Sequence, residues 1–256
     1  MPNIHHAAAT GFAAKSDTYV AGRPDYPTAL DTWLRAELQL GPGKTVLDLG
    51  AGTGKFLGTL RPTGARIVAV EPVAAMLAQL TRDNPDAEAH LGMADAIPLA
   101  DGSVEAVICA QAFHWFATPQ ALAEIHRVMK PGGVLGLVWN VRDETVGWVA
   151  QLTKIIAPHS GDAPRYATRQ WQQLFPAKGF APLIEAHFPH GHTGSPEDVI
   201  VKRAMSVSFV AALPEAEQRR VAAEVCALVA ATPELAGKPQ VTFPYVTAAF
   251  SCQRLG

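Results

Sequence analysis

Residues 45–54 read TVLDLGAGTG, and this stretch decides the fold. Residues 45–49 are mostly apolar and β-branched, as in a buried strand. Gly50, Gly52 and Gly54 follow, and a short helical pattern resumes at Phe56. Glycine lets a backbone turn tightly and approach a ligand closely, and the N-terminus of the following helix attracts negative charge. The stretch therefore predicts a strand, a ligand-binding turn and a helix in succession.

Strand-length apolar runs and helical patterns alternate on both sides of this turn. The strands predicted in the first half cover residues 45–49, 66–70, 87–91, 104–109 and 134–139, the last one following Pro131-Gly132-Gly133. The helices begin after Pro27, after Gly54, at Pro72 and at Thr118. Such alternation is typical of a parallel sheet covered by helices on both faces. The predicted class is α/β, with a doubly wound, mostly parallel sheet.

The second half of the chain has longer helical patterns. They predict helices over residues 148–157, 165–178 and 214–231, a helix start at 195–198, and strands over 183–188 and 241–250. No repeat or long linker divides the chain. We expect a single domain over residues 1–256, with an N-terminal lid and first helix in 1–43, a ligand-binding core in 44–140, and cap helices with the final strands in 141–256.

The composition excludes several classes of protein. Lys and Arg number 21 against 23 Asp and Glu, without any basic run, so a nucleic-acid partner is not expected. No apolar run approaches the roughly 18 residues of a membrane span. The N-terminus lacks the pattern of a secretory signal, so we expect a cytoplasmic protein without a membrane partner. The three cysteines lie far apart, which argues against disulfides and thiolate metal sites.

The residues after the glycine turn indicate which nucleotide it binds. A dinucleotide-binding turn reads GxGxxG, but Lys55 stands where the third glycine would fall, which disfavours an NAD-dependent oxidoreductase. Glu71 ends the second strand roughly 20 residues after the turn, the spacing at which an acid accepts hydrogen bonds from ribose hydroxyls. A ligand that contains ribose is therefore predicted. The alternative is that the turn is only a tight connection and Glu71 an exposed acid.

With these residues in place, the chain resembles the class I S-adenosylmethionine-dependent methyltransferases, specifically the methyltransferase type 11 group and its trans-aconitate-methyltransferase-like members. The motifs that carry the resemblance are GRPDYP at 22–27, VLDLGAGTGKF at 46–56, VAVEP at 68–72, GMADA at 92–96, AQAFHWF at 110–116, RVMKPGG at 127–133 and VWN at 138–140. The resemblance implies a Rossmann-like fold, S-adenosylmethionine as the cofactor, and a helical C-terminal elaboration that selects the methyl acceptor.

The resemblance also implies a set of cofactor contacts. The set is Tyr19, Arg23, Asp48, Gly50, Ala51, Gly52, Glu71, Pro72, Met76, Asp95, Ala96 and Gln111. Asp48 would face the methionyl part of the cofactor, Glu71 the ribose and Asp95 the adenine, since an acid accepts hydrogen bonds from amino and hydroxyl groups. Met76 is equally suited to a helix core, and Arg23 to an ion pair with Asp25.

The methyl acceptor is expected beside the residues that follow the fourth strand. His114 lies there, at the edge of the sheet where ligands of open α/β folds bind. It would take a proton from the acceptor, orient it, or only shape the pocket, because a carboxylate acceptor needs no base. The other acceptor-site candidates are Trp115, Trp139, Asn140, Arg142 and Trp148. Trp115 and Phe116 are equally suited to ordinary packing.

The sequence thus predicts an S-adenosylmethionine-dependent methyltransferase acting on a small molecule through an oxygen such as a carboxylate or hydroxyl. A non-catalytic module that binds the cofactor is the alternative from another class. His187, His190 and His192 have a spacing that suits a metal, but no neighbouring acid or cysteine completes the set, so no metal site is expected. Four arginines could neutralise an acidic acceptor, although isolated arginines are usually solvated: Arg142, Arg165, Arg169 and Arg203.

Overall fold

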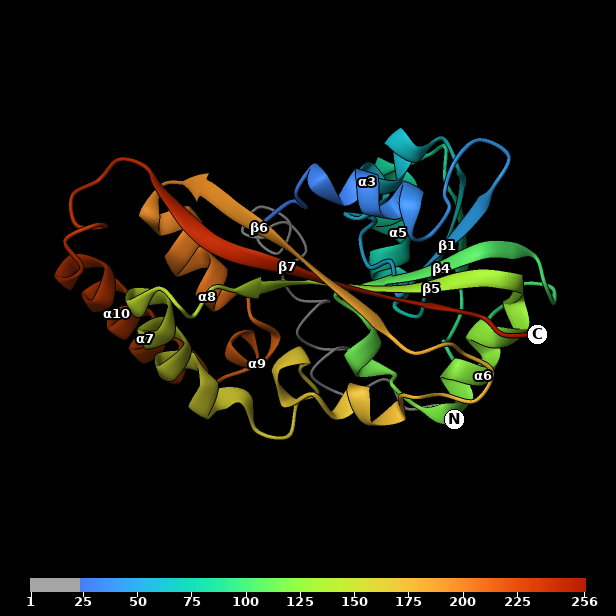
Figure 1. Cartoon of the computed structure of the whole chain (residues 1–256). Coiled ribbons are helices and arrows are strands. Elements are labelled where there is room, and N and C mark those ends of the chain that lie inside the picture. Colours follow the sequence, from blue (N-terminus) through green and yellow to red (C-terminus); the bar gives the residue numbers. More distant parts are fainter. Residues whose placement is uncertain (1–23) are drawn as a thin grey trace.

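The computed structural model describes residues 24–256, which form one seven-stranded sheet with helices around it (Figure 1). The strands are β1 (Thr45–Leu49), β2 (Arg66–Glu71), β3 (Glu88–Leu91), β4 (Val104–Ala110), β5 (Met129–Arg142), β6 (Ile184–Gly194) and β7 (Val241–Gln253). Their order across the sheet is β3-β2-β1-β4-β5-β7-β6. The first five strands run parallel, and β7 pairs antiparallel with both β5 and β6. The predicted α/β class is confirmed.

The strand order reverses beside β1, and this fixes where a ligand binds. The chain moves from β1 outward to β3 and then returns to the other side of β1 as β4. In open α/β sheets, ligands bind beyond the carboxyl ends of the strands at such a reversal. Leu49 ends β1 and Ala110 ends β4. The glycine turn and the segment after β4 therefore meet at this point.

Alternating side chains of the strands pack against helices on the two faces of the sheet. Four helices flank the parallel strands: α3 (Ala29–Ala36), α4 (Leu57–Leu60), α5 (Ala74–Asp83) and α6 (Pro119–Val128). Val46 of β1 belongs to the same apolar cluster as Trp33 of α3. Leu47, its neighbour in the chain, belongs to the cluster that contains Ile125 of α6. The period of two along a strand thus buries β1 on both faces.

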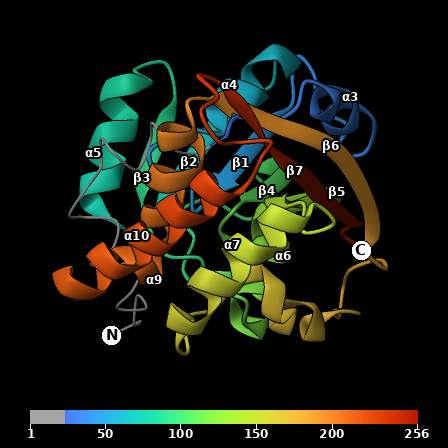
Figure 2. The same cartoon turned by 90° about the vertical axis from the view of Figure 1, so that its left-hand side faces the viewer.

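A second group of helices covers the far ends of the three longest strands, and we call it the cap. It comprises α7 (Gly147–Ile156), the π-helical segment η6 (Glu197–Lys202), α8 (Arg203–Met205), α9 (Ser208–Ala211) and α10 (Glu215–Ala231). Figures 1 and 2 show these helices gathered around β6, β7 and the end of β5. Trp148 of α7 packs edge-on against Phe243 of β7, with ring centroids 5.0 Å apart. Within residues 24–256, no helix has the length and apolar character of a membrane span.

The helix predicted over residues 165–178 is wrong. The segment contains two short 3-10 turns, η4 (Tyr166–Thr168) and η5 (Gln170–Leu174). Arg169 between them has φ 55°, in the left-handed region, so a continuous helix cannot pass. Trp171 packs instead against Trp139, with ring centroids 4.6 Å apart. The apolar residues of this segment therefore belong to an aromatic cluster rather than to one face of a helix.

Two predicted strands are longer in the structure. The strand expected at 183–188 continues to Gly194, and β5 begins at Met129, so that Pro131-Gly132-Gly133 lies inside the strand. The pairing with β4 is irregular at this motif, because Val104 pairs with Met129 but Ala106 pairs with Val134. A Cβ at Gly133 would lie 2.7 Å from the carbonyl oxygen of Glu105. Pro131-Gly132-Gly133 is thus part of β5, at a point where the backbones of β4 and β5 approach closely, rather than a loop that precedes β5.

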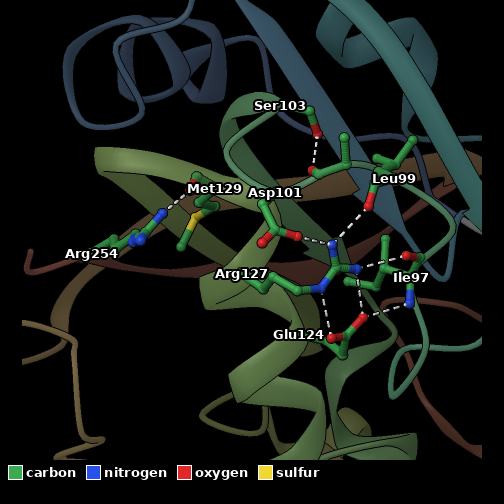
Figure 3. A network of polar contacts seen from close by, with 9 residues as sticks. Ile97, Leu99, Asp101, Ser103, Glu124, Arg127, Met129 and Arg254 are labelled. Carbon is green, nitrogen blue, oxygen red and sulfur yellow. Dashed lines mark hydrogen bonds and ion pairs between the residues drawn. The ribbon is translucent and has the colours of Figure 1, made fainter.

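Arg127 of α6 holds the segment between β3 and β4 in place (Figure 3). Its guanidinium donates to the carbonyl oxygens of Ile97 and Leu99, at 2.9 and 2.8 Å, and to Asp101, at 2.7 Å. It also donates twice to Glu124, whose carboxylate accepts from the backbone N–H of Ile97. These charge-assisted hydrogen bonds raise the pKa of Arg127 and lower that of Glu124. The network fixes residues 97–101 against the helix.

We expect Arg127→Gln to lower the free energy of unfolding by about 2 kcal/mol, because it leaves carbonyl groups and Glu124 without their donor. Urea denaturation followed by circular dichroism measures the change. Arg219→Gln is the matched control, since Arg219 is an exposed residue of α10 paired only with exposed Glu215. Equal stability of the two variants would contradict the role given to the network.

Candidate functional site

The glycine turn after β1 depends on backbone conformations and space that only glycine provides. Gly50, Gly52 and Gly54 have φ values of 75°, 59° and 83°, in the left-handed region. A Cβ at Gly50 would lie 2.8 Å from the Cβ of Ala112, in the segment after β4. A Cβ at Gly52 would meet only the end of the Met76 side chain, at 3.8 Å. The turn thus lies against the segment after β4 and remains open beside Met76.

Glu71 fastens this turn to the end of β2. One carboxylate oxygen accepts from the N–H of Gly52 at 2.8 Å, and the other accepts from the N–H of Val73 at 2.9 Å. Burial raises the pKa of Glu71, and the two backbone hydrogen bonds oppose that effect. A carboxylate oxygen has more than one lone pair, so each oxygen can still accept from a ligand hydroxyl. The position predicted for ribose binding therefore also supports the turn.

Asp48 is a buried acid without a partner among the described residues. Its side chain is 1% exposed, and neither carboxylate oxygen has a hydrogen bond. Burial, and then the charge of Glu71, raises its pKa to about 8. A buried polar group without a partner is rare in native proteins and costs stability. Two buried acids with unused acceptor capacity beside a glycine turn suit a cationic ligand.

Residues 95–96, which are predicted to contact adenine, include another hydrogen-bond acceptor without a partner among the described residues. One carboxylate oxygen of Asp95 is buried without a hydrogen bond, which suits an amino group of a base. The next residues, from Ile97 onward, are fixed by the network of Glu124 and Arg127. Met76 of α5 is buried beside Gly52. Ala51 and Ala96 lie in the turns that carry Gly52 and Asp95, and Pro72 follows Glu71 directly.

The segment after β4 forms the opposite wall of the site. Gln111 has φ 58°, a left-handed conformation that is rare for residues other than glycine. Its N–H donates to the carbonyl of Val138 at 2.8 Å, which connects the end of β4 to β5. A Cβ at Gly50 would lie 3.2 Å from the ring of Phe116, so this ring covers the glycine turn. Strained backbone at the end of a strand is common in functional sites.

His114 lies in the same segment and accepts a hydrogen bond from Trp139. The indole Nε1–H of Trp139 donates to Nδ1 of His114 at 3.1 Å. An indole nitrogen can only donate, so Nδ1 must carry a lone pair. The neutral ring then carries its proton on Nε2. Trp139 is buried in the aromatic cluster with Trp171, and the ring of Trp115 lies 5.0 Å from that of His114.

The remaining predicted residues have different surroundings. Asn140 donates to the carbonyl of Asp25 at 2.9 Å and accepts from the hydroxyl of Thr247 at 2.6 Å, so it joins the chain before α3 to β7. Trp148 belongs to the apolar core of the cap. Predicted Tyr19 and Arg23 lie outside the described residues. Among residues 24–256, no three His, Cys, Asp or Glu side chains are placed to hold a metal ion.

Sequence reasoning missed residues that shape the site from a distance. Arg127 was quoted only as part of a motif, although it fixes the segment after the predicted adenine contact. Lys55, noted as a departure from a fingerprint, pairs with Asp25 at 3.2 Å and so links the glycine turn to the chain before α3. The spacing of Arg127 and Glu124, one turn apart on a helix, was an available signal.

Asp48→Asn is expected to stabilise the protein without ligand at alkaline pH. The folded-state pKa of Asp48, about 8, lies above its ordinary value of 3.8. The stability contributed by the protonated acid is therefore present below that ordinary value and is lost as the pH rises through about 8. The variant escapes this loss. Thermal unfolding should show similar Tm values at about pH 5 and a Tm higher by about 5 °C in the variant above pH 8. A variant that is less stable at alkaline pH would contradict an unpaired buried acid.

Comparison with known proteins identifies the family. Residues 47–137 match the family model of a methyltransferase domain. An uncharacterized methyltransferase-like protein of Schizosaccharomyces pombe is 39% identical over 237 residues, or 92% of each chain. The fold is similar to that of a proposed type II methyltransferase from Anaeromyxobacter dehalogenans, with a TM-score of 0.61 and 24% identity over 91% of this chain and 97% of that one. A malonyl-acyl-carrier-protein O-methyltransferase of Methylococcus capsulatus is 41% identical over 101 residues, 37% of this chain and 36% of that protein. This chain therefore belongs to the class I S-adenosylmethionine-dependent methyltransferases.

Proposed function

We propose that this methyltransferase transfers the methyl group to an oxygen of a small molecule, and that this oxygen belongs to a carboxylate. The observation that carries the proposal is the hydrogen bond from Trp139 to Nδ1 of His114. It leaves His114 as a donor, through Nε2–H, rather than as a base. A donor suits an acceptor that is already ionised.

The described residues fit the cofactor, S-adenosylmethionine, whose charge at the reacting end is positive. Asp48 and Glu71 supply acceptor sites beside the glycine turn, and a bound cation would favour the ionised form of Asp48, whose pKa burial raises to about 8. The amino group would take Asp48 as its acceptor, and the ribose hydroxyls would take Glu71. Asp95, whose buried oxygen has no hydrogen bond, would accept from the adenine amino group. Met76, Ala96 and Gln111 would enclose the nucleoside.

When bound, the cofactor supplies an electrophilic methyl group on a sulfonium. A lone pair of the acceptor carboxylate would form the new oxygen–carbon bond, and the electrons of the broken carbon–sulfur bond would stay on the sulfur. No proton moves in this step, so the protein needs to position the acceptor and exclude water. Nε2–H of His114 would hold the carboxylate oxygen that does not react. His114 would then be a substrate-positioning residue.

A hydroxyl acceptor is less compatible with this geometry. A proton removed by His114 would have to be held at Nδ1, where it would displace the indole hydrogen bond of buried Trp139. An indole N–H buried without an acceptor costs stability. The partial match to a malonyl-acyl-carrier-protein O-methyltransferase supports an oxygen acceptor, although it covers only 37% of this chain.

Titration calorimetry with S-adenosylhomocysteine tests the cofactor site. We expect micromolar binding by the wild type, no binding of NAD, and loss of binding in Gly52→Val, because a branched side chain at φ 59° distorts the turn that Glu71 holds. Gly58→Ala is the matched control, since a Cβ at Gly58 has nothing within 4 Å. Binding of NAD in preference to S-adenosylhomocysteine would overturn the assignment.

Nitrogen NMR of the histidine rings tests the role of His114. We expect the Nε2–H form at neutral pH, and a mixture of both neutral forms in Trp139→Phe, where the indole donor is removed. His114→Gln, which keeps an N–H donor, should retain methylation of a carboxylate acceptor to within about 10-fold, whereas His114→Ala should lose more. A wild-type ring protonated on Nδ1, with a rate that rises through about pH 6.5, would instead indicate a base.

A further inference from the structure

Polar side chains from three elements meet where the cap joins the sheet. His190 of β6 and Tyr245 of β7 are paired across the two strands, with ring centroids 6.4 Å apart. His192 lies two residues further along β6 and therefore on the same face as His190. Arg203 belongs to α8, and Figure 1 shows α8 close to this end of β6 and β7. We call His190, His192, Arg203 and Tyr245 the junction cluster.

Three members of the junction cluster have buried polar atoms without a hydrogen-bond partner. These atoms are Nε2 of His190, Nε of Arg203 and the hydroxyl oxygen of Tyr245. Tyr245 is 2% exposed, and its ring stacks on Phe243 with centroids 4.7 Å apart, so its position is fixed by packing. Native proteins rarely leave such groups unsatisfied, and residues 24–256 supply a partner for none of these three atoms. The Nε–H of Arg203 and the hydroxyl of Tyr245 can donate to an acceptor, whereas Nε2 of His190 carries a lone pair, because the proton of the neutral ring lies on the nitrogen that donates to the backbone of Asp25.

The charges around the junction cluster are mainly positive. Burial lowers the pKa of His190 and His192, and the charges of Lys55 and Arg203 lower that of His192 further. Two acids lie near these histidines. Asp25 raises the pKa of both, and its side chain is 90% exposed and lies 3.2 Å from Lys55. Asp198 is paired with Lys202 and also interacts with His192, and both lower its pKa. The imidazoles are therefore neutral at neutral pH, and the free donors beside them are the guanidinium of Arg203 and the hydroxyl of Tyr245. Such a set of donors suits an anion.

The junction cluster lies close to the cofactor site along the same strands. Asn140 of β5 pairs with Thr247 of β7, and its backbone carbonyl accepts from the side chain of Gln111 at 3.4 Å. Tyr245 lies two residues from Thr247 on β7, about 7 Å further along the strand and on the same face. The junction cluster is thus connected through β5 and β7 to the segment after β4.

We propose that the junction cluster is an anion subsite that binds a carboxylate or phosphate group of the methyl acceptor, separate from the oxygen that is methylated. Arg203 supplies the charge, and the hydroxyl of Tyr245 supplies a neutral donor. The subsite rests on the proposed function, because it assigns the anion to the acceptor. It predicts that this enzyme prefers acceptors with two anionic groups over acceptors with one.

Anion titration of the protein saturated with S-adenosylhomocysteine tests the proposal. The probes are succinate and inorganic phosphate, with succinamide as the uncharged control, and the readouts are the ring signals of His190 and the Tm. We expect succinate or phosphate to shift both readouts in the wild type, the stronger of the two identifying the kind of anion. Succinamide should shift neither. Absence of any shift with both anions would overturn the subsite.

Two variants test whether the anion binds at the junction cluster. Arg203→Gln removes the charge, and Tyr245→Phe removes the hydroxyl while keeping the ring that stacks on Phe243. Each should weaken the anion Kd by about 10-fold or more, with the affinity for S-adenosylhomocysteine unchanged. Arg219→Gln, on the exposed face of α10, should behave as wild type. Equal anion affinity in the variants and the wild type would overturn the proposal.

S-adenosylmethionine carries a carboxylate of its own. A further experiment must therefore distinguish binding of this carboxylate by the junction cluster from binding of the methyl acceptor. Variants that weaken S-adenosylhomocysteine but not 5′-methylthioadenosine, which lacks the amino-acid part, would assign the cluster to the cofactor and overturn the proposal. A failure of the wild type to bind S-adenosylhomocysteine at all would count against the proposed function instead. The anion titration of the ligand-free protein would then still report on the subsite itself.

Discussion

The hydrogen bond between Glu71 and the N–H of Gly52, 2.8 Å long, is the interaction on which the site depends. It joins the end of β2 to the middle of the glycine turn, while the N–H groups of Gly50 and Ala51 both donate to the carbonyl of Val70. The turn is thus held to β2 by its backbone and by one side chain. Because Gly50 in turn touches the segment after β4, the position of Glu71 also determines where that segment lies.

The buried charged and polar groups at the glycine turn and in the junction cluster suit ligand binding better than they suit stability. Asp48 and Glu71 place two acids below the glycine turn, and the pKa of each is raised by burial. At the other end of the long strands, Arg203 and its neighbours place donors without acceptors. Each group costs stability in the chain alone, and under the proposed function each would be satisfied by a ligand group of opposite character. The cofactor end therefore favours cations, and the cap end favours anions.

Most of the fold could be predicted because its signals are local. The glycine turn, Glu71 at the end of a strand and the Thr118 cap, which accepts from Ala121, each depend on residues within a few positions of one another. The predictions failed where distant contacts decide. Trp171 lies in a turn, where its ring packs against those of Trp139 and Phe250. Pro131-Gly132-Gly133 forms part of β5 because the backbone of the neighbouring strand β4 lies close to Gly133. The junction cluster combines residues 190, 203 and 245, which are too far apart in the sequence for a motif to predict that they lie together.

The long strands β5 and β7 connect the two ends of the site while keeping their tasks apart. Trp139 points to the face that holds α6 and supports His114, whereas Asn140 points to the opposite face and reaches Thr247. Successive residues of one strand therefore serve the methyl-transfer position and the path to the cap. If the junction cluster binds an anion as proposed, substitutions in β6 or α8 would change which anion is held without disturbing Glu71 or the glycine turn. The proposed subsite lies outside residues 47–137, which match the family model, so the acceptor would be selected by a part of the sheet that the model does not cover.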